Sequence, residues 1–200
     1  MSDLRPQAVF LCAHGAGGHK DDASMRRLAA ALEPAGFDVV RFNFPYREKG
    51  SRRIDAPDVL KDAFRLQIDS TRKLKSKSKI FFGGRSMGGR IASMLAADGA
   101  ACDGLLLAAY PLHPAGKPEK LRTAHLPAIR CPVLCLNGTR DPLCERELME
   151  EALKSVRAPW TMHWLEGADH SFHVLKSSGR TDADLDAEVR AAAARWLSSL

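Results

Sequence analysis

Six short apolar segments alternate with helix-like segments along the chain, and this alternation restricts the fold more than any other feature of the sequence. The apolar segments are residues 8–14, 37–44, 79–84, 104–110, 132–138 and 160–167. Continuous apolar runs of this length are typical of strands that are buried on both faces of a sheet. Strands that alternate with helices predict crossover connections, and therefore a parallel sheet with helices on both sides.

Five segments carry the periodicity of amphipathic helices. They are residues 24–36, 57–75, 87–99, 144–156 and 182–199. In the second of these, Val59, Phe64 and Leu74 are among the residues expected to face the core. No linker rich in Ser, Gly or Pro and no internal repeat interrupts the pattern. The sequence therefore predicts one α/β domain over residues 1–200, with a doubly wound, mostly parallel six-stranded sheet.

The composition and the charge narrow the class of protein. A chain of 200 residues with 45% hydrophobic residues is large enough to bury the core of one globular domain. The net charge of +6 comes mainly from residues 47–53 and 72–79, and no aromatic residue is interleaved with the second run. A solvated helix end explains that run better than a nucleic-acid site, because single-stranded nucleic acids stack on aromatic side chains. We therefore expect no nucleic-acid partner.

The apolar runs are too short for a membrane span or a signal peptide. Residues 8–13 lack a basic leader, and no other run approaches the ~20 residues that cross a bilayer. We expect a cytoplasmic protein without a membrane partner, as a monomer or a small homo-oligomer. Of the five cysteines, Cys12, Cys131 and Cys135 lie in strand-like runs, which predicts reduced thiols that act as small buried hydrophobes.

A serine surrounded by glycines lies at the junction between the third predicted strand and the next helix. Residues 84–88 read Gly-Arg-Ser-Met-Gly, the G-x-S-x-G pattern of a turn that is too tight for side chains at its flanking positions. Such a turn holds a strained nucleophile above the sheet and directs the following backbone amide at the reacting oxygen. Ser86 is therefore the candidate nucleophile, and the amide of Met87 is one candidate oxyanion donor.

A serine nucleophile needs a histidine to take its proton and a carboxylate to orient that histidine. Asp141 directly follows the fifth predicted strand and His170 directly follows the sixth, so both reach the edge of the sheet at which Ser86 lies. Each residue alone reads as an ordinary turn or loop residue, but their order and placement together favour a catalytic triad. His173 and His163 are the alternative bases. This chemistry needs no metal and no organic cofactor.

The loop after the first predicted strand supplies the other candidate oxyanion donor. Residues 14–19 read HGAGGH and place the amides of Ala16 and Gly17 near the end of that strand. A phosphate-binding loop is the alternative, but neither G-x-G-x-x-G nor G-x-x-x-x-G-K-[ST] is present. We expect either Ala16 or Gly17 to be the second donor.

Four stretches resemble the functional loops of the α/β-hydrolase superfamily. They are AHGAGG, GGRSMGG, NGTRDPLC and GADHSF. The stretch NFPYRE, followed by an arginine pair, is also similar to small predicted hydrolases related to dienelactone hydrolases and to NSL-complex-subunit-3-like proteins. The resemblance implies that Ser86 is the nucleophile, Asp141 the acid and His170 the base. Dienelactone hydrolases carry a cysteine where this chain has Ser86, so their substrate does not transfer to it.

The resemblance also has two departures that shape the expected site. The chain starts almost directly with the oxyanion strand, so we expect the first two strands of the full superfamily sheet to be absent. Residues 111–131 are too few for a helical cap domain, which predicts an open site. Its expected substrate-binding residues are Tyr46, Arg47, His113 and Phe172. Arg47 and Arg85 are candidates either to bind an acidic substrate group or to form ion pairs.

Two classes of function remain at this point. The motifs favour a carboxylesterase-like serine hydrolase that cleaves an ester, thioester or related acyl bond of a small-molecule substrate through an acyl-enzyme. The alternative is a non-catalytic α/β-hydrolase domain that acts as a binding or scaffold module.

Overall fold

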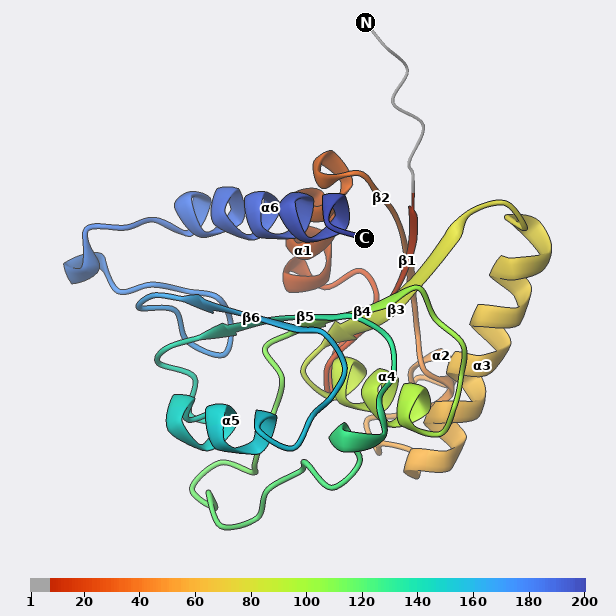
Figure 1. Cartoon of the computed structure of the whole chain (residues 1–200), viewed down its shortest axis with the longest axis horizontal. Helices are drawn as coiled ribbons and strands as arrows, with labels where there is room; N and C mark the ends of the chain where they lie inside the picture. The colour runs from red at the N-terminus through yellow and green to blue at the C-terminus, as the bar shows by residue number, and fades with distance from the viewer. Residues whose placement is uncertain (1–7) are drawn as a thin grey trace, which may run out of the picture.

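Six parallel strands form the centre of the molecule (Figure 1). The structure, a computed structural model, describes residues 8–200, so residues 1–7 of the predicted domain lie outside the described residues. The strands are β1 (Ala8–Ala13), β2 (Phe37–Phe42), β3 (Lys79–Arg85), β4 (Gly104–Ala108), β5 (Val133–Gly138) and β6 (Trp160–Leu165). They lie in the order β2-β1-β3-β4-β5-β6, which confirms the predicted doubly wound sheet.

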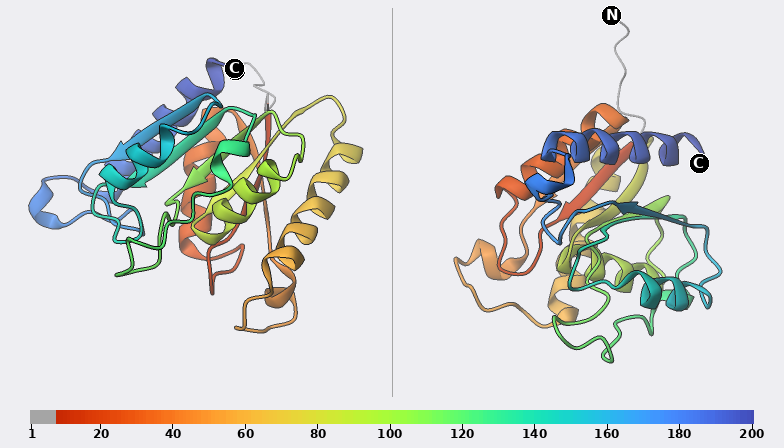
Figure 2. Two further views of the ribbon diagram at one scale, coloured as in Figure 1. Left: turned by 60° about the horizontal axis from the view of Figure 1, so that its bottom comes forward. Right: turned by 90° about the vertical axis from the view of Figure 1, so that its left-hand side faces the viewer.

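Helices cover both faces of this sheet, as Figures 1 and 2 show. One face carries α1 (Ala23–Leu32) and α6 (Asp182–Ser198). The opposite face carries α3 (Pro57–Leu74), α4 (Met87–Ala97) and α5 (Arg146–Leu153). The short elements are α2 (Pro45–Glu48) and the 3₁₀ turns η1 (Glu33–Ala35), η2 (Leu126–Ala128) and η3 (Lys176–Ser178).

Two apolar cores fill the spaces between the sheet and its helix layers. On the side of α3, the ring of Phe64 packs edge-on against Phe42, with centroids 4.9 Å apart, and tilted against Phe82 at 5.6 Å. On the side of α6, Phe81 packs edge-on against Trp196 at 5.6 Å. Phe81 and Phe82 serve opposite cores because successive side chains of a strand point to opposite faces of the sheet.

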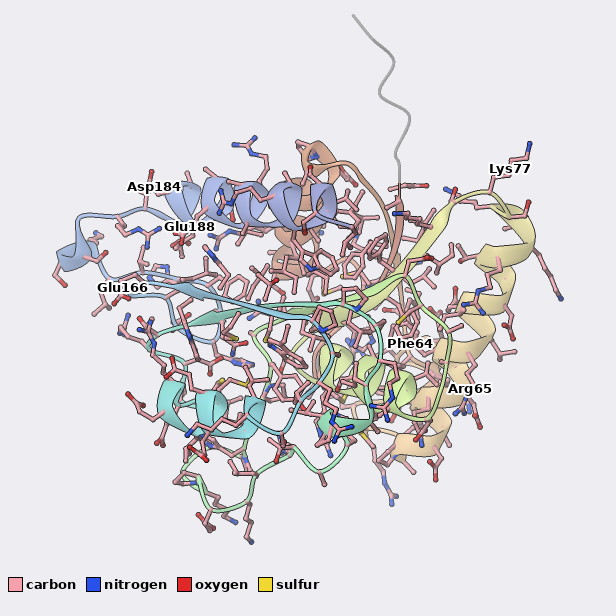
Figure 3. All side chains as sticks on the ribbon, viewed as in Figure 1. Phe64, Arg65, Lys77, Glu166, Asp184 and Glu188 are labelled. Atoms are coloured by element: carbon pink, nitrogen blue, oxygen red, sulfur yellow. The ribbon has the colours of Figure 1, made fainter. Side chains whose placement is uncertain are left out.

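Helix α3 follows the predicted periodicity only in part. Leu60, Phe64 and Ile68 are buried at the expected spacing, and Figure 3 shows Phe64 on the inner side of the helix. Val59 and Leu74 are 45% and 81% exposed, so the expectation that they face the core was wrong. With 3.6 residues per turn, Val59 lies about 100° around the helix from Leu60, and Leu74 is the last residue of α3, beyond the buried row.

The strand order brings the predicted functional loops to one edge of the sheet. Strand β1 has β2 on one side and β3 on the other, so the connections after β1 and β3 diverge at this point. Open α/β sheets bind ligands at such a switch point, beyond the carboxyl ends of the strands. The loops after β5 and β6 end at the same edge because all six strands are parallel.

The segment between β4 and β5 does not form a cap domain. Residues 111–131 contain η2 and are otherwise irregular. They are attached to α4 through His125, whose Nε2 lies 2.8 Å from the hydroxyl of the buried Ser93. Among residues 8–200, the first strand of the sheet along the chain is β1, which precedes the HGAGGH loop. Within those residues, no helix combines the length and the apolar character that a bilayer crossing needs.

Candidate active site

The turn between β3 and α4 holds Ser86 in a strained backbone conformation. Its φ of 50° and ψ of −116° are unfavourable for a residue with a side chain. A Cβ atom at Gly84 would lie 2.1 Å from the carbonyl oxygen of Ala13, and one at Gly88 would lie 2.3 Å from the same atom. The flanking glycines are therefore required because the turn packs directly against the end of β1.

A chain of two hydrogen bonds joins Ser86, His170 and Asp141. The Nε2 atom of His170 lies 2.9 Å from the Ser86 Oγ, and its Nδ1 atom lies 2.7 Å from the Asp141 Oδ2. An ionised carboxylate only accepts hydrogen bonds, so Nδ1 carries the proton and Nε2 is left to accept one from the serine hydroxyl. The structure thus brings together the three residues that the sequence predicted as nucleophile, acid and base.

The carboxylate of Asp141 is buried and held by the protein on both oxygens. The residue is 4% exposed. The amide of Leu143 donates to Oδ1 at 2.8 Å, and the Nδ2 of Asn137 lies 3.4 Å from Oδ2. Asn137 is itself fixed by the backbone of Tyr110, to whose carbonyl it donates at 3.1 Å. These contacts orient the oxygen that meets His170. No sequence motif marks Asn137 as part of the site, although it lies at the end of β5 next to the acid turn.

The loop that carries His170 is anchored from several directions. Asp169 accepts hydrogen bonds from the amides of Ser171 and His173, at 2.7 and 3.1 Å, so its carboxylate caps its own loop. A guanidinium nitrogen of Arg85 donates to the carbonyl of His170. Phe172, with a φ of 58°, lies under that guanidinium, 5.6 Å from ring centroid to Cζ. The residue next to the nucleophile therefore supports the histidine loop.

The two alternative bases are engaged elsewhere. His173 Nδ1 lies 3.0 Å from a carboxylate oxygen of Asp182 at the start of α6. His163 Nε2 lies 2.9 Å from a carboxylate oxygen of Glu188, which Figure 3 shows on the side of α6 that faces the sheet. His170 is thus the histidine that contacts Ser86.

The HGAGGH loop presents backbone amides beside Ser86. The buried side chain of His14 holds this loop in place, because its Nδ1 donates a hydrogen bond to the carbonyl of Gly15 at 2.8 Å. Burial lowers the pKa of His14. The amide of Gly18 is bonded to the carbonyl of Gly15. Within residues 8–200 the amides of Ala16 and Gly17 have no backbone acceptor, and both residues line the hollow that contains Ser86.

Met87 is the first residue of α4, so its amide has no acceptor within the helix. The positive end of the α4 dipole lies at the same place and favours negative charge there. The amide of Met87 and the amides of Ala16 and Gly17 are therefore available to an oxyanion.

An open hollow of about 510 Å³ lies over these groups. Its lining includes the oxyanion loop, Ser24 and Met25 of α1, Arg85, Ser86, Leu143 and His170. A second hollow of about 260 Å³ adjoins it, shares Ser24, Arg85 and Ser171, and is lined largely by apolar groups that include Leu28, Phe172 and Val189. Arg85 lies at the boundary between the two hollows.

The predicted substrate-binding residues do not all reach this space. Tyr46 and His113 are each 1% exposed and line neither hollow, so the expectation that they contact substrate is corrected. Tyr46 packs edge-on against the His14 ring, with centroids 5.8 Å apart, and His113 donates to the carbonyl of Pro114. Arg47 also lies outside both hollows, and only Phe172 lines one of them.

Arg85 is the cation that faces the site. Burial lowers the pKa of its guanidinium. The negative charges of Asp141 and Asp169, which form no ion pair with Arg85, offset part of this lowering. Among residues 8–200 Arg85 forms no ion pair, and the acceptor of its hydrogen bond is the neutral backbone carbonyl of His170. A half-buried positive charge without a carboxylate partner is costly unless a ligand supplies the opposite charge. The same described residues contain no group of three His, Cys, Asp or Glu side chains placed to hold a metal ion.

Comparisons with known proteins agree with the fold. A family model described as an alpha/beta hydrolase domain matches residues 6–198, so the chain belongs to that family. The fold is similar to that of an alpha-beta serine hydrolase homologue from Coxiella burnetii, with a TM-score of 0.77, 21% identity, and coverage of 95% of this chain and 86% of the other.

Two further solved structures share the fold. A serine hydrolase without a lid from Xanthomonas campestris has a TM-score of 0.75 and 22% identity, over 98% of this chain and 85% of the other. A dienelactone hydrolase from Anabaena variabilis has a TM-score of 0.73 and 19% identity, over 96% of this chain and 86% of the other. This chain has the α/β-hydrolase fold without a cap.

Proposed function

We propose that this member of the α/β-hydrolase family is a serine hydrolase that cleaves an ester, thioester or related acyl bond of a small substrate through an acyl-enzyme. Ser86 is the nucleophile, His170 the general base and Asp141 the residue that orients it. The observation that carries the proposal is the pair of hydrogen bonds that runs from the Ser86 hydroxyl through His170 to a buried carboxylate.

The geometry supports each step of acyl transfer. As the Ser86 oxygen attacks the carbonyl carbon, Nε2 of His170 takes the hydroxyl proton, and Asp141 stabilises the resulting imidazolium. The carbonyl oxygen becomes negative and is stabilised by the amide of Met87 together with that of Ala16 or Gly17. His170 then returns its proton to the leaving group, which departs and leaves an acyl group on Ser86. A water molecule, activated by the same histidine, releases the acid.

The charge beside the nucleophile narrows the proposed substrates. Arg85 lines the hollow at Ser86 and has no carboxylate partner among residues 8–200, whereas Arg47 lies outside that hollow. A carboxylate on the substrate would form a charge-assisted hydrogen bond with Arg85 in a partly desolvated place. We therefore favour small acyl substrates that carry a second acidic group.

Labelling with a fluorophosphonate probe tests the proposal against the alternative of a non-catalytic binding module. We expect the wild-type protein to be labelled and Ser86→Ala to remain unlabelled, because the probe reacts with an activated serine. His170→Ala should be labelled far more slowly, since its serine has lost the proton acceptor. A folded wild-type protein that resists the probe would favour the binding module.

A further inference from the structure

Two cysteines lie against each other at the edge of the sheet opposite the candidate active site. Cys102 precedes β4, Cys131 precedes β5, and these two strands are neighbours. Their sulfur atoms are 2.6 Å apart. Both residues are partly exposed, whereas the other three cysteines, Cys12, Cys135 and Cys144, are buried. Cys131 therefore differs from the prediction of a buried thiol inside a strand.

A surface hollow gives small molecules access to this pair. It has a volume of about 290 Å³ and is lined by the two cysteines and by small residues that include Ala96, Gly99 and Ala128. Arg130 also lines it. The buried thiols have no such access, and burial raises the pKa of each of them.

The two sulfur atoms are chemically unequal. The hydrogen bond that Cys131 accepts from the Cys102 thiol lowers the pKa of Cys131. The same bond, together with burial, raises the pKa of Cys102. Because the thiolate is the reactive form, we expect Cys131 to attack first and Cys102 second, an order that the serine variants of the two residues test.

We propose that Cys102 and Cys131 form a redox-active dithiol, which becomes an intramolecular disulfide by exchange with a small-molecule disulfide. The Cys131 thiolate attacks one sulfur of the reagent, forms a mixed disulfide and releases the first reagent thiolate. Cys102 then loses its proton and attacks the Cys131 sulfur, and the second reagent thiolate departs. In total, two protein thiols lose two electrons and two protons, and one reagent disulfide becomes two thiols.

The new bond closes a loop that contains β4 and residues 111–131. The sulfur atoms are already in contact, so the exchange requires no rearrangement of the strands. A cross-link of this length restricts the unfolded chain, so the oxidised protein should melt at a higher temperature than the reduced protein. The pair lies at the amino ends of the strands and the Ser86 site at their carboxyl ends, so fluorophosphonate labelling should not depend on oxidation.

The test uses the full chain, equilibrated with oxidised and reduced glutathione at several ratios. After an acid quench, the free thiols are alkylated in denaturant and the protein is analysed by mass spectrometry. We expect all five cysteines to be alkylated under reducing conditions and three under oxidising conditions, with the peptides of Cys102 and Cys131 linked. Five alkylated cysteines at every ratio, or a linkage through any other pair, would overturn the proposal.

Variants test the order of the two steps. Cys102→Ser should accumulate a mixed disulfide between glutathione and Cys131, because the second thiol is missing. Cys131→Ser should acquire glutathione on Cys102 much more slowly. The matched control is Cys135→Ser, which removes a buried thiol and should still form the Cys102–Cys131 disulfide. Equal rates of glutathione uptake by the first two variants would contradict the assignment of Cys131 as the attacking thiol.

Discussion

At the scale of single residues, the site depends on which side chains face one another across the carboxyl edge of the sheet. His170 reaches Ser86 and Asp141 because its loop is fixed by Asp169 and by Arg85. His173 is three residues away in sequence, yet it points to Asp182. Position in the chain alone therefore cannot show which of the two histidines is the candidate base, whereas their hydrogen-bond partners can.

The first prediction concerns the acid and the base. His170→Ala should nearly abolish the hydrolysis of p-nitrophenyl acetate, because the serine loses its proton acceptor. Asp141→Asn should lower kcat by roughly 10⁴-fold, since an amide at this position favours the wrong histidine tautomer. His173→Ala is the matched control and should stay near the wild-type rate. A kcat/KM within about twofold of wild type for either of the first two variants would reassign that role.

The second prediction concerns Arg85 and acidic substrates. The p-nitrophenyl half-ester of succinate and p-nitrophenyl butyrate have similar acyl size but differ by one carboxylate. The selectivity is the kcat/KM for the succinate half-ester divided by the kcat/KM for the butyrate ester. Arg85→Gln should lower this ratio by roughly tenfold or more, because a hydrogen bond between two charged groups is lost. Arg85 also supports the histidine loop, and the loss of that support should change kcat/KM for both esters by the same factor. This effect therefore cancels in the ratio.

Arg47→Gln provides the control for this selectivity, since Arg47 lies outside both hollows. It should leave the ratio unchanged. Raised salt should weaken the preference for the succinate ester in the wild-type protein, because ions screen the charge of a partly exposed arginine. If the wild type and Arg85→Gln show the same ratio, Arg85 serves only to support the loop.

At the scale of elements, the turn between β3 and α4 is fixed by its contact with β1. The third prediction is that Gly88→Ala destabilises the protein by about 2–4 kcal/mol, because the new methyl group would collide with the backbone carbonyl of Ala13. Gly99→Ala is the comparison, since a Cβ there meets no atom within 4 Å and costs only the ~1–2 kcal/mol of its positive φ. Chemical denaturation measures both. Equal losses for the two variants would show that the contact with β1 does not constrain the turn.

The sequence predicted elements better than it predicted the directions of individual side chains. The six strands and the main helices follow from runs and periodicities that depend on local spacing alone. Helical spacing predicts that Val59 and Leu74 lie inside, but the apolar character of a residue does not reveal that its side of the helix, or the end of the helix, is exposed to solvent. Tyr46 and His113 were assigned to the site from their position after strands, but packing against His14 and against the Pro114 turn takes them into the interior. Likewise, nothing local to Cys102 or Cys131 shows that neighbouring strands bring them together.

At the scale of the whole molecule, residues 8–200 contain no cap above the site, and this should limit the acyl chain. The fourth prediction is that kcat/KM for p-nitrophenyl esters peaks between acetate and butyrate and falls by octanoate. Each further methylene contributes up to ~0.8 kcal/mol only where it is covered, and the hollow over Ser86 is open to solvent. A rate that rises steadily to palmitate, with activation at lipid interfaces, would indicate an apolar cover that residues 111–131 do not provide.

The central claim is that Ser86 becomes acylated during turnover, and the acyl-enzyme itself is the most direct test of it. The wild-type protein is mixed with p-nitrophenyl butyrate, quenched in acid within the first turnovers, digested, and analysed by mass spectrometry. We predict a butyryl group on the peptide that contains Ser86, formed as fast as p-nitrophenol is released in the first turnover. Turnover without any acyl adduct, or an adduct on another residue that forms and decays at the rate of turnover, would contradict the account.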